Sequence, residues 1–101
     1  MASRAAGNTL GIAPAAEVIA VKCWDDINQS RDGDIVAGFE WVVDAAWRSG
    51  KPSVLNLSWS TEHNRAFTRA ANSAISAGIQ VVGSSGNYGE DSRSYFPAGS
   101  E

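Results

Sequence analysis

The sequence predicts an α/β fold in which parallel strands alternate with helices in the order β-α-β-α-β. Residues 17–23, 53–58 and 79–83 are short, mostly apolar and rich in Val, Ile and Leu, which is typical of strands buried on both faces of a sheet. The two stretches between them carry apolar residues at helical spacing. Because short connections join these elements, the strands should be parallel and the crossovers right-handed.

Length and composition fit one small globular domain. The chain has 101 residues, of which 44% are hydrophobic and 19% charged, and its formal net charge is −3. This profile excludes disorder, and no basic tract favours nucleic acid as a partner. The longest strictly apolar run, residues 18–21, is far too short for a membrane span. A single cysteine, Cys23, excludes an internal disulfide and a multi-cysteine metal site, and no cofactor is expected.

The first helix is expected to begin after the polar residues 24–31 and to end near Gly50. Ser30 or Asp32 is a suitable N-cap, and Gly50 followed by Pro52 is a typical end signal. The apolar face of this helix consists of Ile35, Phe39, Val42, Val43 and Ala46. Trp41 and Trp47 lie on the same helix and are expected to pack rather than to bind a ligand.

The second helix is expected between the second and third strands. Ser60 and Thr61 mark its start, Glu62 is favoured in the first turn, and Gly78 marks its end. Its inner face consists of Phe67, Ala70, Ala71, Ala74 and Ile75. Residues 84–101 have the composition of a loop.

The predicted order leaves one face of the sheet without a cover. If neighbouring strands pair in chain order, both right-handed crossovers place their helices on the same face. Residues 18–21 are nevertheless apolar in succession, so both faces of the first strand need burial. We therefore expect either a covering layer from outside these residues or self-association through the uncovered face.

Polar, small and aromatic residues follow each predicted strand at its carboxyl end, where open parallel sheets bind their ligands. These segments are Trp24-Asp25-Asp26, Ser58-Trp59-Ser60 and Ser84-Ser85-Gly86-Asn87. Asn87 offers amide donors beside Gly86 and is suited to stabilise a developing oxyanion. The alternative is a turn asparagine without a chemical role.

A collinear set of short motifs runs along nearly the whole chain. They are LGIAP (10–14), IAVK (19–22), WDD (24–26), IVAGFEWVV (35–43), VLNLS (54–58), AGIQVV (77–82), GN (86–87) and YFPA (95–98). In order and spacing they resemble the central part of a subtilisin-like serine protease (a subtilase of the peptidase S8 type), closest to the fungal proteinase K-like branch. The resemblance implies a parallel β-α-β-α-β portion of a three-layer subtilisin-like fold, with residues 1–101 forming part of a peptidase domain.

The resemblance also implies roles for the residues at the strand ends. Asn87 takes the position of the family's oxyanion-hole asparagine, and residues 28–30 fall where the family pairs with extended polypeptide substrate. The implied substrate-binding walls are Ser58, Trp59 and Ser60 on one side and Ser84, Ser85 and Gly86 on the other. The implied activity is hydrolysis of peptide bonds, and members of the family are typically secreted or vacuolar.

The family's catalytic Asp, His and Ser motifs have no counterpart in these residues. His63, the sole histidine, falls where the family has no catalytic residue. Acyl transfer needs a nucleophile and a base, so we expect the chain to be inactive on its own. Ser60 and Thr61 replace glycines and Trp59 replaces a smaller Leu, which predicts a narrowed cleft. The alternatives are a non-catalytic α/β module that binds peptides or dimerises, and a truncated relic.

Two N-glycosylation sequons are present. Asn28-Gln29-Ser30 lies in a predicted loop and is usable only if the chain is exported. Asn56-Leu57-Ser58 lies in a predicted buried strand and is expected to be unused.

Overall fold

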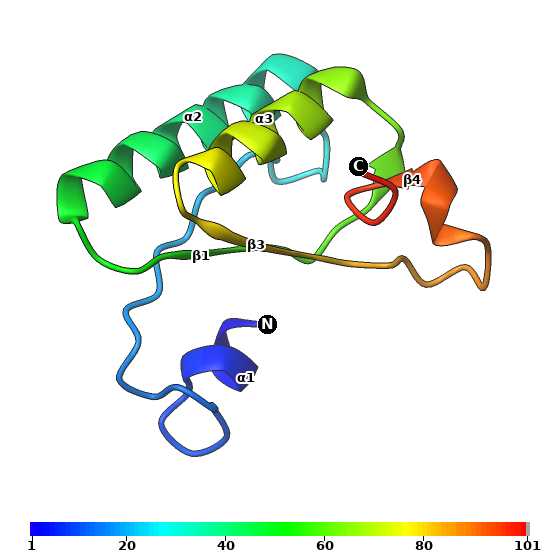
Figure 1. Cartoon of the computed structure of the whole chain (residues 1–101). Helices are drawn as coiled ribbons and strands as arrows, with labels where there is room; N and C mark the ends of the chain where they lie inside the picture. The colour runs from blue at the N-terminus through cyan, green and yellow to red at the C-terminus, as the bar shows by residue number, and fades with distance from the viewer. Residues whose placement is uncertain (101) are drawn as a thin grey trace.

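The structure, a computed structural model, describes residues 1–100 and confirms an α/β fold (Figure 1). In chain order its elements are α1 (Ala2–Ala6), α2 (Asp32–Ser49), β1 (Val54–Leu57), β2 (Thr61–Glu62), α3 (Arg65–Ser76), β3 (Gln80–Gly83), the 3-10 turn η1 (Ser92–Ser94) and β4 (Tyr95–Phe96). β1 and β3 form a parallel pair, whereas β2 and β4 form a small antiparallel ribbon.

The parallel pair β1–β3 is the centre of the fold. Its register runs from Val54 opposite Gln80 to Leu57 opposite Gly83. The pairing continues past β3, because the Ser84 amide donates to the Leu57 carbonyl at 3.0 Å. α2 and α3 lie side by side on one face of this sheet, as the sequence predicts (Figure 1).

The predicted strand over residues 17–23 is not formed. Within the part of the chain that the structure describes, these residues have no backbone pairing with β1, and β1 pairs with β3 alone. Residues 21 and 23 instead lie along α2 at Gly38, where the Cys23 sulfur would be 2.5 Å from an added Cβ. β-branched residues favour a strand only where a neighbouring strand completes its hydrogen bonds, and within residues 1–100 this segment makes none with the free edge of β1.

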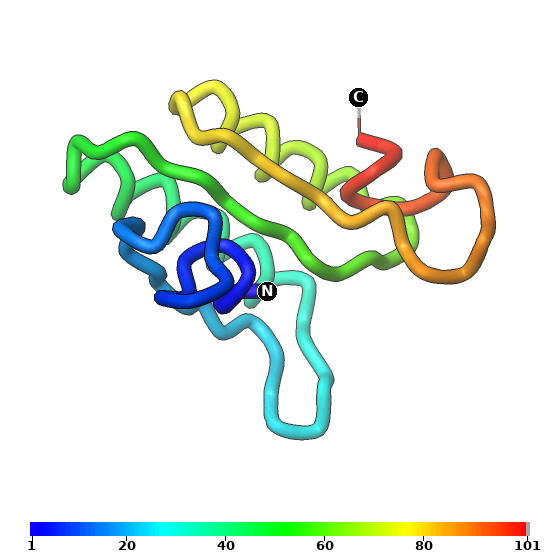
Figure 2. Tube along the Cα trace, turned by 90° about the horizontal axis from the view of Figure 1, so that it is seen from below, coloured from blue at the N-terminus to red at the C-terminus, as the bar shows by residue number. Residues whose placement is uncertain are grey.

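The face of the sheet opposite α2 and α3 is uncovered, as expected from the strand order. Leu57 points toward the helices and is only 4% exposed, whereas Val54 and Val82 point away and are 69% and 53% exposed. α1 lies on this side but leaves both valines open to solvent (Figures 1 and 2). The sheet therefore has one buried face and one apolar face without a partner.

α2 ends as predicted but begins differently. Gly50 adopts a left-handed conformation with φ of 63°, and its amide donates to the Ala46 carbonyl, which closes the helix. At the other end Arg31 is the N-cap, and neither Ser30 nor Asp32 supplies a capping side chain. The Ser30 hydroxyl donates instead to the Cys23 carbonyl at 2.5 Å.

The tryptophans of α2 do not pack as expected. Trp47 is 82% exposed and Trp41 is also exposed. Ile35 and Phe39 are the buried residues of this helix, and they occupy the face turned toward the sheet. A helix with one covering layer buries one face only, so Trp47 is left outside.

α3 begins four to five residues later than predicted. Asn64 is its N-cap, and the Asn64 side-chain oxygen accepts from the Ala66 amide at 2.8 Å. Thr61 and Glu62 form β2 and pair with Phe96 and Tyr95 of β4. The predicted start at Ser60 and Thr61 is therefore wrong, because Thr61 and Glu62 pair with a strand in the last segment of the chain. The end is confirmed, since Gly78 follows the C-cap with φ of 86°.

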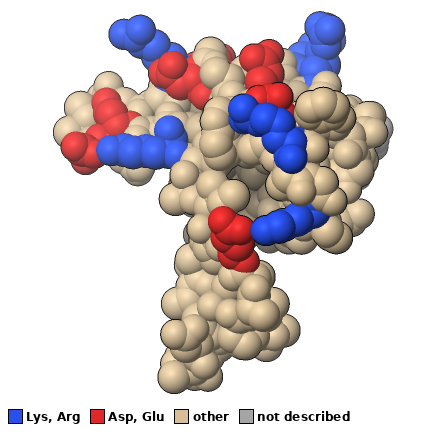
Figure 3. Space-filling model, turned by 90° about the vertical axis from the view of Figure 1, so that its left-hand side faces the viewer, with Lys and Arg blue, Asp and Glu red and all other residues tan. Residues whose placement is uncertain are grey.

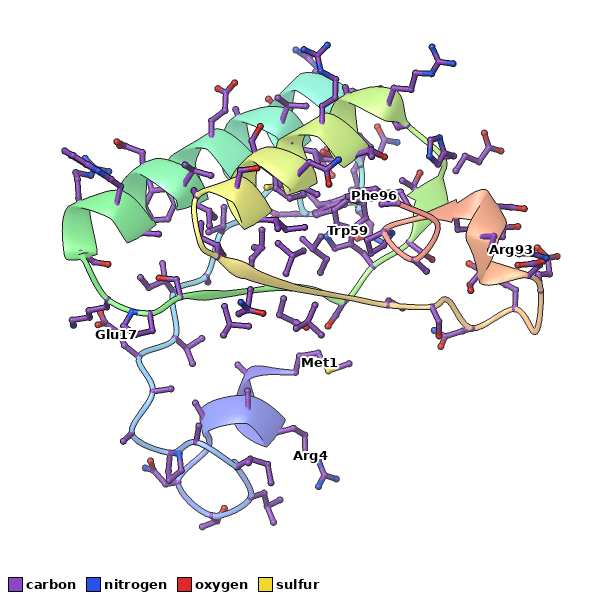
Figure 4. The ribbon with its side chains drawn as sticks, in the orientation of Figure 1. Met1, Arg4, Glu17, Trp59, Arg93 and Phe96 are labelled. Carbon is purple, nitrogen blue, oxygen red and sulfur yellow. The ribbon has the colours of Figure 1, made fainter. Side chains whose placement is uncertain are left out.

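The core is built around aromatic rings. Phe96 is fully buried (0% exposed) and its ring lies 5.6 Å from that of Phe67, 6.3 Å from Phe39 and 5.3 Å from Trp59. Figure 4 shows Phe96 and Trp59 together beneath the helices. Residues 84–101 were expected to be loop-like, yet they supply the most buried large side chain of the described residues.

Candidate functional site

The two predicted cleft walls lie next to each other in the structure. Ser58, Trp59 and Ser60 follow β1, and Ser84, Ser85 and Gly86 follow its parallel neighbour β3. A Cβ atom placed on Gly86 would lie 3.8 Å from the hydroxyl oxygen of Ser60, so the two walls face each other across a short gap. The carboxyl ends of β1 and β3 therefore bring these segments to one edge of the sheet.

The wall after β3 is a tight turn held by its own serine. The Ser84 hydroxyl oxygen accepts from the Gly86 amide at 3.1 Å. Gly86 has φ of 86°, a left-handed conformation that strains any residue with a side chain. Glycine at this position allows the chain to turn toward Ser60, and the turn presents Asn87 directly after it.

Asn87 is exposed at the end of this turn. Within residues 1–100 its side-chain amide takes part in no hydrogen bond, so both N–H groups are free to donate to a ligand. A primary amide held at the edge of a parallel sheet can stabilise negative charge on a substrate oxygen. His63 is exposed directly before the N-cap of α3, and the Asn64 side chain beside it donates to Asp32 at 3.0 Å.

The wall after β1 is anchored by Trp59. The Trp59 ring is half-buried and packs against Trp24 at 4.9 Å, Phe96 at 5.3 Å and Phe67 at 6.1 Å. Most of this side chain is therefore committed to the core. Ser58 is exposed, and its hydroxyl accepts from the Asn56 amide at 2.7 Å. That these residues bind substrate remains a prediction. Their backbone groups and the exposed hydroxyls are available to form hydrogen bonds with a substrate.

Residues 24–30 form a closed turn. Asp25 organises it, because its carboxylate accepts from the amides of Ile27 at 3.1 Å and Gln29 at 2.8 Å. The Asp25 amide donates in turn to the Gln29 carbonyl at 2.8 Å. Asn28 sits at the tip with φ of 63°. Residues 28–30 thus belong to a turn, and not to an extended strand ready to pair with a substrate.

A groove lies away from these two walls, beside α2. This groove of about 760 Å³ runs between residues 20–31 and α2, and Cys23, Trp24 and Trp41 are among its lining residues. Burial, with a smaller contribution from the negative charge of Asp34, raises the pKa of the Cys23 thiol in this groove. The sequence motifs did not predict this groove, whose lining depends on how residues 20–31 fold back along α2.

The charges of the surface are paired or interspersed. On the face shown in Figure 3, acidic and basic side chains lie beside one another and form no patch of one sign. Near β4, Tyr95 donates to Glu90, whose carboxylate raises the pKa of the Tyr95 phenol. Arg93 donates to Asp91 and holds the pKa of that carboxyl below its usual value. In residues 1–100 no three Cys, His, Asp or Glu side chains converge in a metal-binding group.

None of the helices described is both long enough and apolar enough to cross a membrane.

Comparison with known proteins identifies the family. The family model described as the Subtilase family matches residues 1–101. A subtilisin-like protease of Coccidioides posadasii is 41% identical over 96 residues, which cover 92% of this chain and 24% of that protein. Subtilisin-like protease 3 of Pseudogymnoascus destructans is 32% identical over 100 residues, covering 97% of this chain and 25% of that protein. Among solved structures, sphericase matches with a TM-score of 0.78 and 28% identity over 87% of this chain and 29% of its own.

The chain belongs to the subtilase family, and it corresponds to a portion of a subtilisin-like protease. It spans about a quarter of the length of the curated relatives that it matches. The recognition of the family from motifs spread over nearly the whole chain is confirmed. The α/β class is confirmed as well, although the first of the three expected strands is not formed.

Proposed function

We propose that these residues form the central part of a subtilisin-like serine endopeptidase domain, with two walls of its substrate cleft and the oxyanion-stabilising Asn87. The supporting observation is the convergence of the wall segments at the carboxyl ends of β1 and β3, with Gly86 facing Ser60 and Asn87 directly beyond. Membership of the subtilase family supports the same reaction class.

Asn87 would act on the tetrahedral intermediate of peptide-bond hydrolysis. When a serine hydroxyl attacks the scissile carbonyl, the carbonyl oxygen becomes negatively charged, and an Asn87 side-chain N–H donates a hydrogen bond to it. The amide is exposed and has no hydrogen bond to break within residues 1–100, and it follows the turn that the Ser84 hydroxyl holds at Gly86. One such donor is typically worth about 10²–10³ in kcat.

The proposed substrate is a polypeptide in extended conformation, with neither nucleic acid nor membrane as a partner. Its backbone would pass along residues 58–60 and 84–86. The Ser60 side chain occupies space close to Gly86, which supports a cleft narrower than one bounded by glycine. No cofactor takes part in the proposed chemistry.

On their own, residues 1–101 would not hydrolyse peptides. Their sequence has no counterpart of the family's Asp, His and Ser motifs. His63 lies directly before the N-cap of α3, where the family has no catalytic residue. An oxyanion donor without nucleophile and base leaves only a small part of the catalysis. The segment would contribute binding and electrostatic stabilisation to a reaction whose nucleophile comes from elsewhere in a complete domain.

A second candidate is a dimerising or peptide-binding module without catalysis. The uncovered apolar face at Val54 and Val82 favours this alternative, because parallel sheets are rarely left open on one side. Sedimentation of the purified chain and of Val82→Lys tests this candidate: a stable dimer that the substitution dissociates supports the module, and a monomer contradicts it.

Two assays test the proposed function. The purified chain should show no stoichiometric labelling by a serine-reactive phosphonate, and labelling would contradict its inactivity. The aligned residues should also be able to replace the corresponding quarter of the C. posadasii relative. A folded chimera that hydrolyses peptide substrates supports the proposal, whereas a folded chimera without activity, beside an active parent, contradicts it.

A further inference from the structure

We propose that Asn28 is an N-glycosylation site, which receives an oligosaccharide when the chain passes through a secretory pathway. Asn28-Gln29-Ser30 meets the sequence requirement for such an acceptor. The proposal goes beyond the proteolytic role and does not depend on it, because it concerns the presentation of one side chain by a surface turn.

The turn presents Asn28 to solvent. The residue is exposed, and its φ of 63° places it at the tip, in a conformation that asparagine tolerates better than most residues. The backbone around it is fixed by Asp25, whose carbonyl accepts from the Asn28 amide at 3.2 Å and whose carboxylate accepts from its neighbours. Within residues 1–100 the Asn28 side chain itself makes no hydrogen bond. A bulky group can therefore be attached there without loss of any contact of the fold.

The second sequon is exposed as well, contrary to the burial expected from the sequence, but it differs in its backbone and in its side-chain contact. Asn56 lies in β1 opposite Val82, and its side-chain amide donates to the Ser58 hydroxyl at 2.7 Å. It lies on the uncovered face of the sheet, whose neighbours Val54 and Val82 are apolar. An oligosaccharide at Asn56 would cost a hydrogen bond and block any layer that covers this face. The two sequons of one chain thus form a natural comparison.

The chemistry is a transfer to the amide nitrogen. The Nδ2 atom of Asn28 forms a bond to the anomeric carbon of a lipid-pyrophosphate-linked oligosaccharide. The bond between that carbon and the pyrophosphate oxygen breaks, the lipid pyrophosphate leaves, and Nδ2 loses one proton. In the folded chain the Ser30 hydroxyl donates to the Cys23 carbonyl at 2.5 Å. This bond must open for the Ser30 hydroxyl to take part in recognition of the sequon, whereas the exposed Asn28 side chain breaks no contact when it reacts.

Translocation into microsomes tests the site. The full chain is translated behind a cleavable signal peptide, with a reporter sequon appended after its last residue, so that a glycan on the reporter marks every translocated molecule. Trypsin separates the two natural sites, because Asn28 falls in the peptide of residues 23–31 and Asn56 in that of residues 49–65. An amidase then releases the glycans in heavy-oxygen water and leaves a labelled Asp at each occupied Asn. Mass spectrometry of the two peptides shows which Asn carried a glycan.

Reporter-positive molecules are expected to carry a second glycan on Asn28. The substitution Asn28→Asp, which keeps the shape of the side chain, should remove it, and Asn56→Asp should leave the pattern unchanged. Reporter-positive molecules without a glycan on Asn28 would overturn the proposal. A glycan found on Asn56 in place of Asn28 would overturn it equally.

Discussion

The rings of Trp24 and Trp59 meet at 65° with their centroids 4.9 Å apart, and this contact joins two segments that share no backbone pairing in residues 1–100. Trp24 begins the turn of residues 24–30, whereas Trp59 belongs to the wall after β1. Because residues 17–23 do not join the sheet, the two indole rings help to hold this turn beside the proposed cleft. Trp59 in turn rests on Phe67 and Phe96.

The Trp24–Trp59 contact should be measurable as a coupling energy. In a cycle of Trp24→Ala, Trp59→Ala and the double substitution, we expect a coupling of about 0.5–1.5 kcal/mol in the free energy of unfolding. Urea unfolding followed by far-ultraviolet circular dichroism gives the three values. Strictly additive losses would mean that the rings do not stabilise one another.

Phe96 should be the most sensitive position of the core. Phe96→Ala removes a fully buried ring that contacts Phe39, Phe67 and Trp59, and such truncations typically cost about 3–5 kcal/mol. For a small domain this loss is expected to abolish cooperative thermal unfolding. Tyr88→Ala is the matched control, because Tyr88 is 76% exposed and its truncation should leave the melting temperature nearly unchanged. Equal melting temperatures for the two variants would contradict the packing described.

Two glycines of α2 should respond in opposite ways to the same substitution. Alanine favours a helix over glycine by about 1 kcal/mol, and Gly33 has open space around it, so Gly33→Ala should stabilise the chain or leave it unchanged. At Gly38 the new methyl group would meet the Cys23 sulfur, so Gly38→Ala should lower stability despite its better helix propensity. The denaturant midpoints of the two variants measure these changes in stability. A stabilising Gly38→Ala would show that residues 21–23 do not pack on α2.

The Cys23 thiol should react slowly at neutral pH. Burial and the charge of Asp34 raise its pKa, so that less thiolate is present in the folded chain than in the unfolded one. The rate of alkylation by a neutral reagent should therefore rise with pH along a curve whose midpoint lies above that measured in urea. Asp34→Asn removes the negative charge that disfavours the thiolate, so it should shift the midpoint downward. Asp44→Asn should not shift it, since Asp44 pairs with Arg48. An unshifted midpoint in Asp34→Asn would contradict the assigned cause.

Local signals in the sequence accounted for much of the fold. Apolar spacing located α2 and α3, and the glycines at positions 50 and 78 marked their ends, because a left-handed residue after a helix favours glycine. The same signals also placed β1 and β3. These elements depend on residues close together in the chain, where spacing and propensity decide.

The elements that the sequence did not predict depend on pairing between residues far apart in the chain. The strand expected at residues 17–23 needs a neighbour, and within residues 1–100 it forms no backbone pairing with the free edge of β1. Thr61 and Glu62 read as the start of a helix, yet they pair with residues 95 and 96, more than thirty positions away. Phe96 lay in a segment of loop-like composition, and its burial depends on that pairing and on the rings of distant residues. No local pattern reports a partner so distant in sequence.

The candidate site was predictable in position and only partly in detail. The rule that ligands bind beyond the carboxyl ends of parallel strands brought together residues 58–60 and 84–87, and the structure places the first segment beside Gly86. The burial of the Trp59 ring was not predictable, because it depends on Trp24, Phe67 and Phe96 from separate parts of the chain.

The role of Asn87 is tested most directly in the chimera with the C. posadasii relative. Asn87→Ala should lower kcat by about 10²–10³ and leave KM little changed, because the lost hydrogen bond forms only with the charged intermediate. Asn72→Ala, which removes an exposed amide on α3, is the control and should leave both constants unaltered. A kcat for Asn87→Ala equal to that of the control would contradict the assignment of Asn87 as the oxyanion donor.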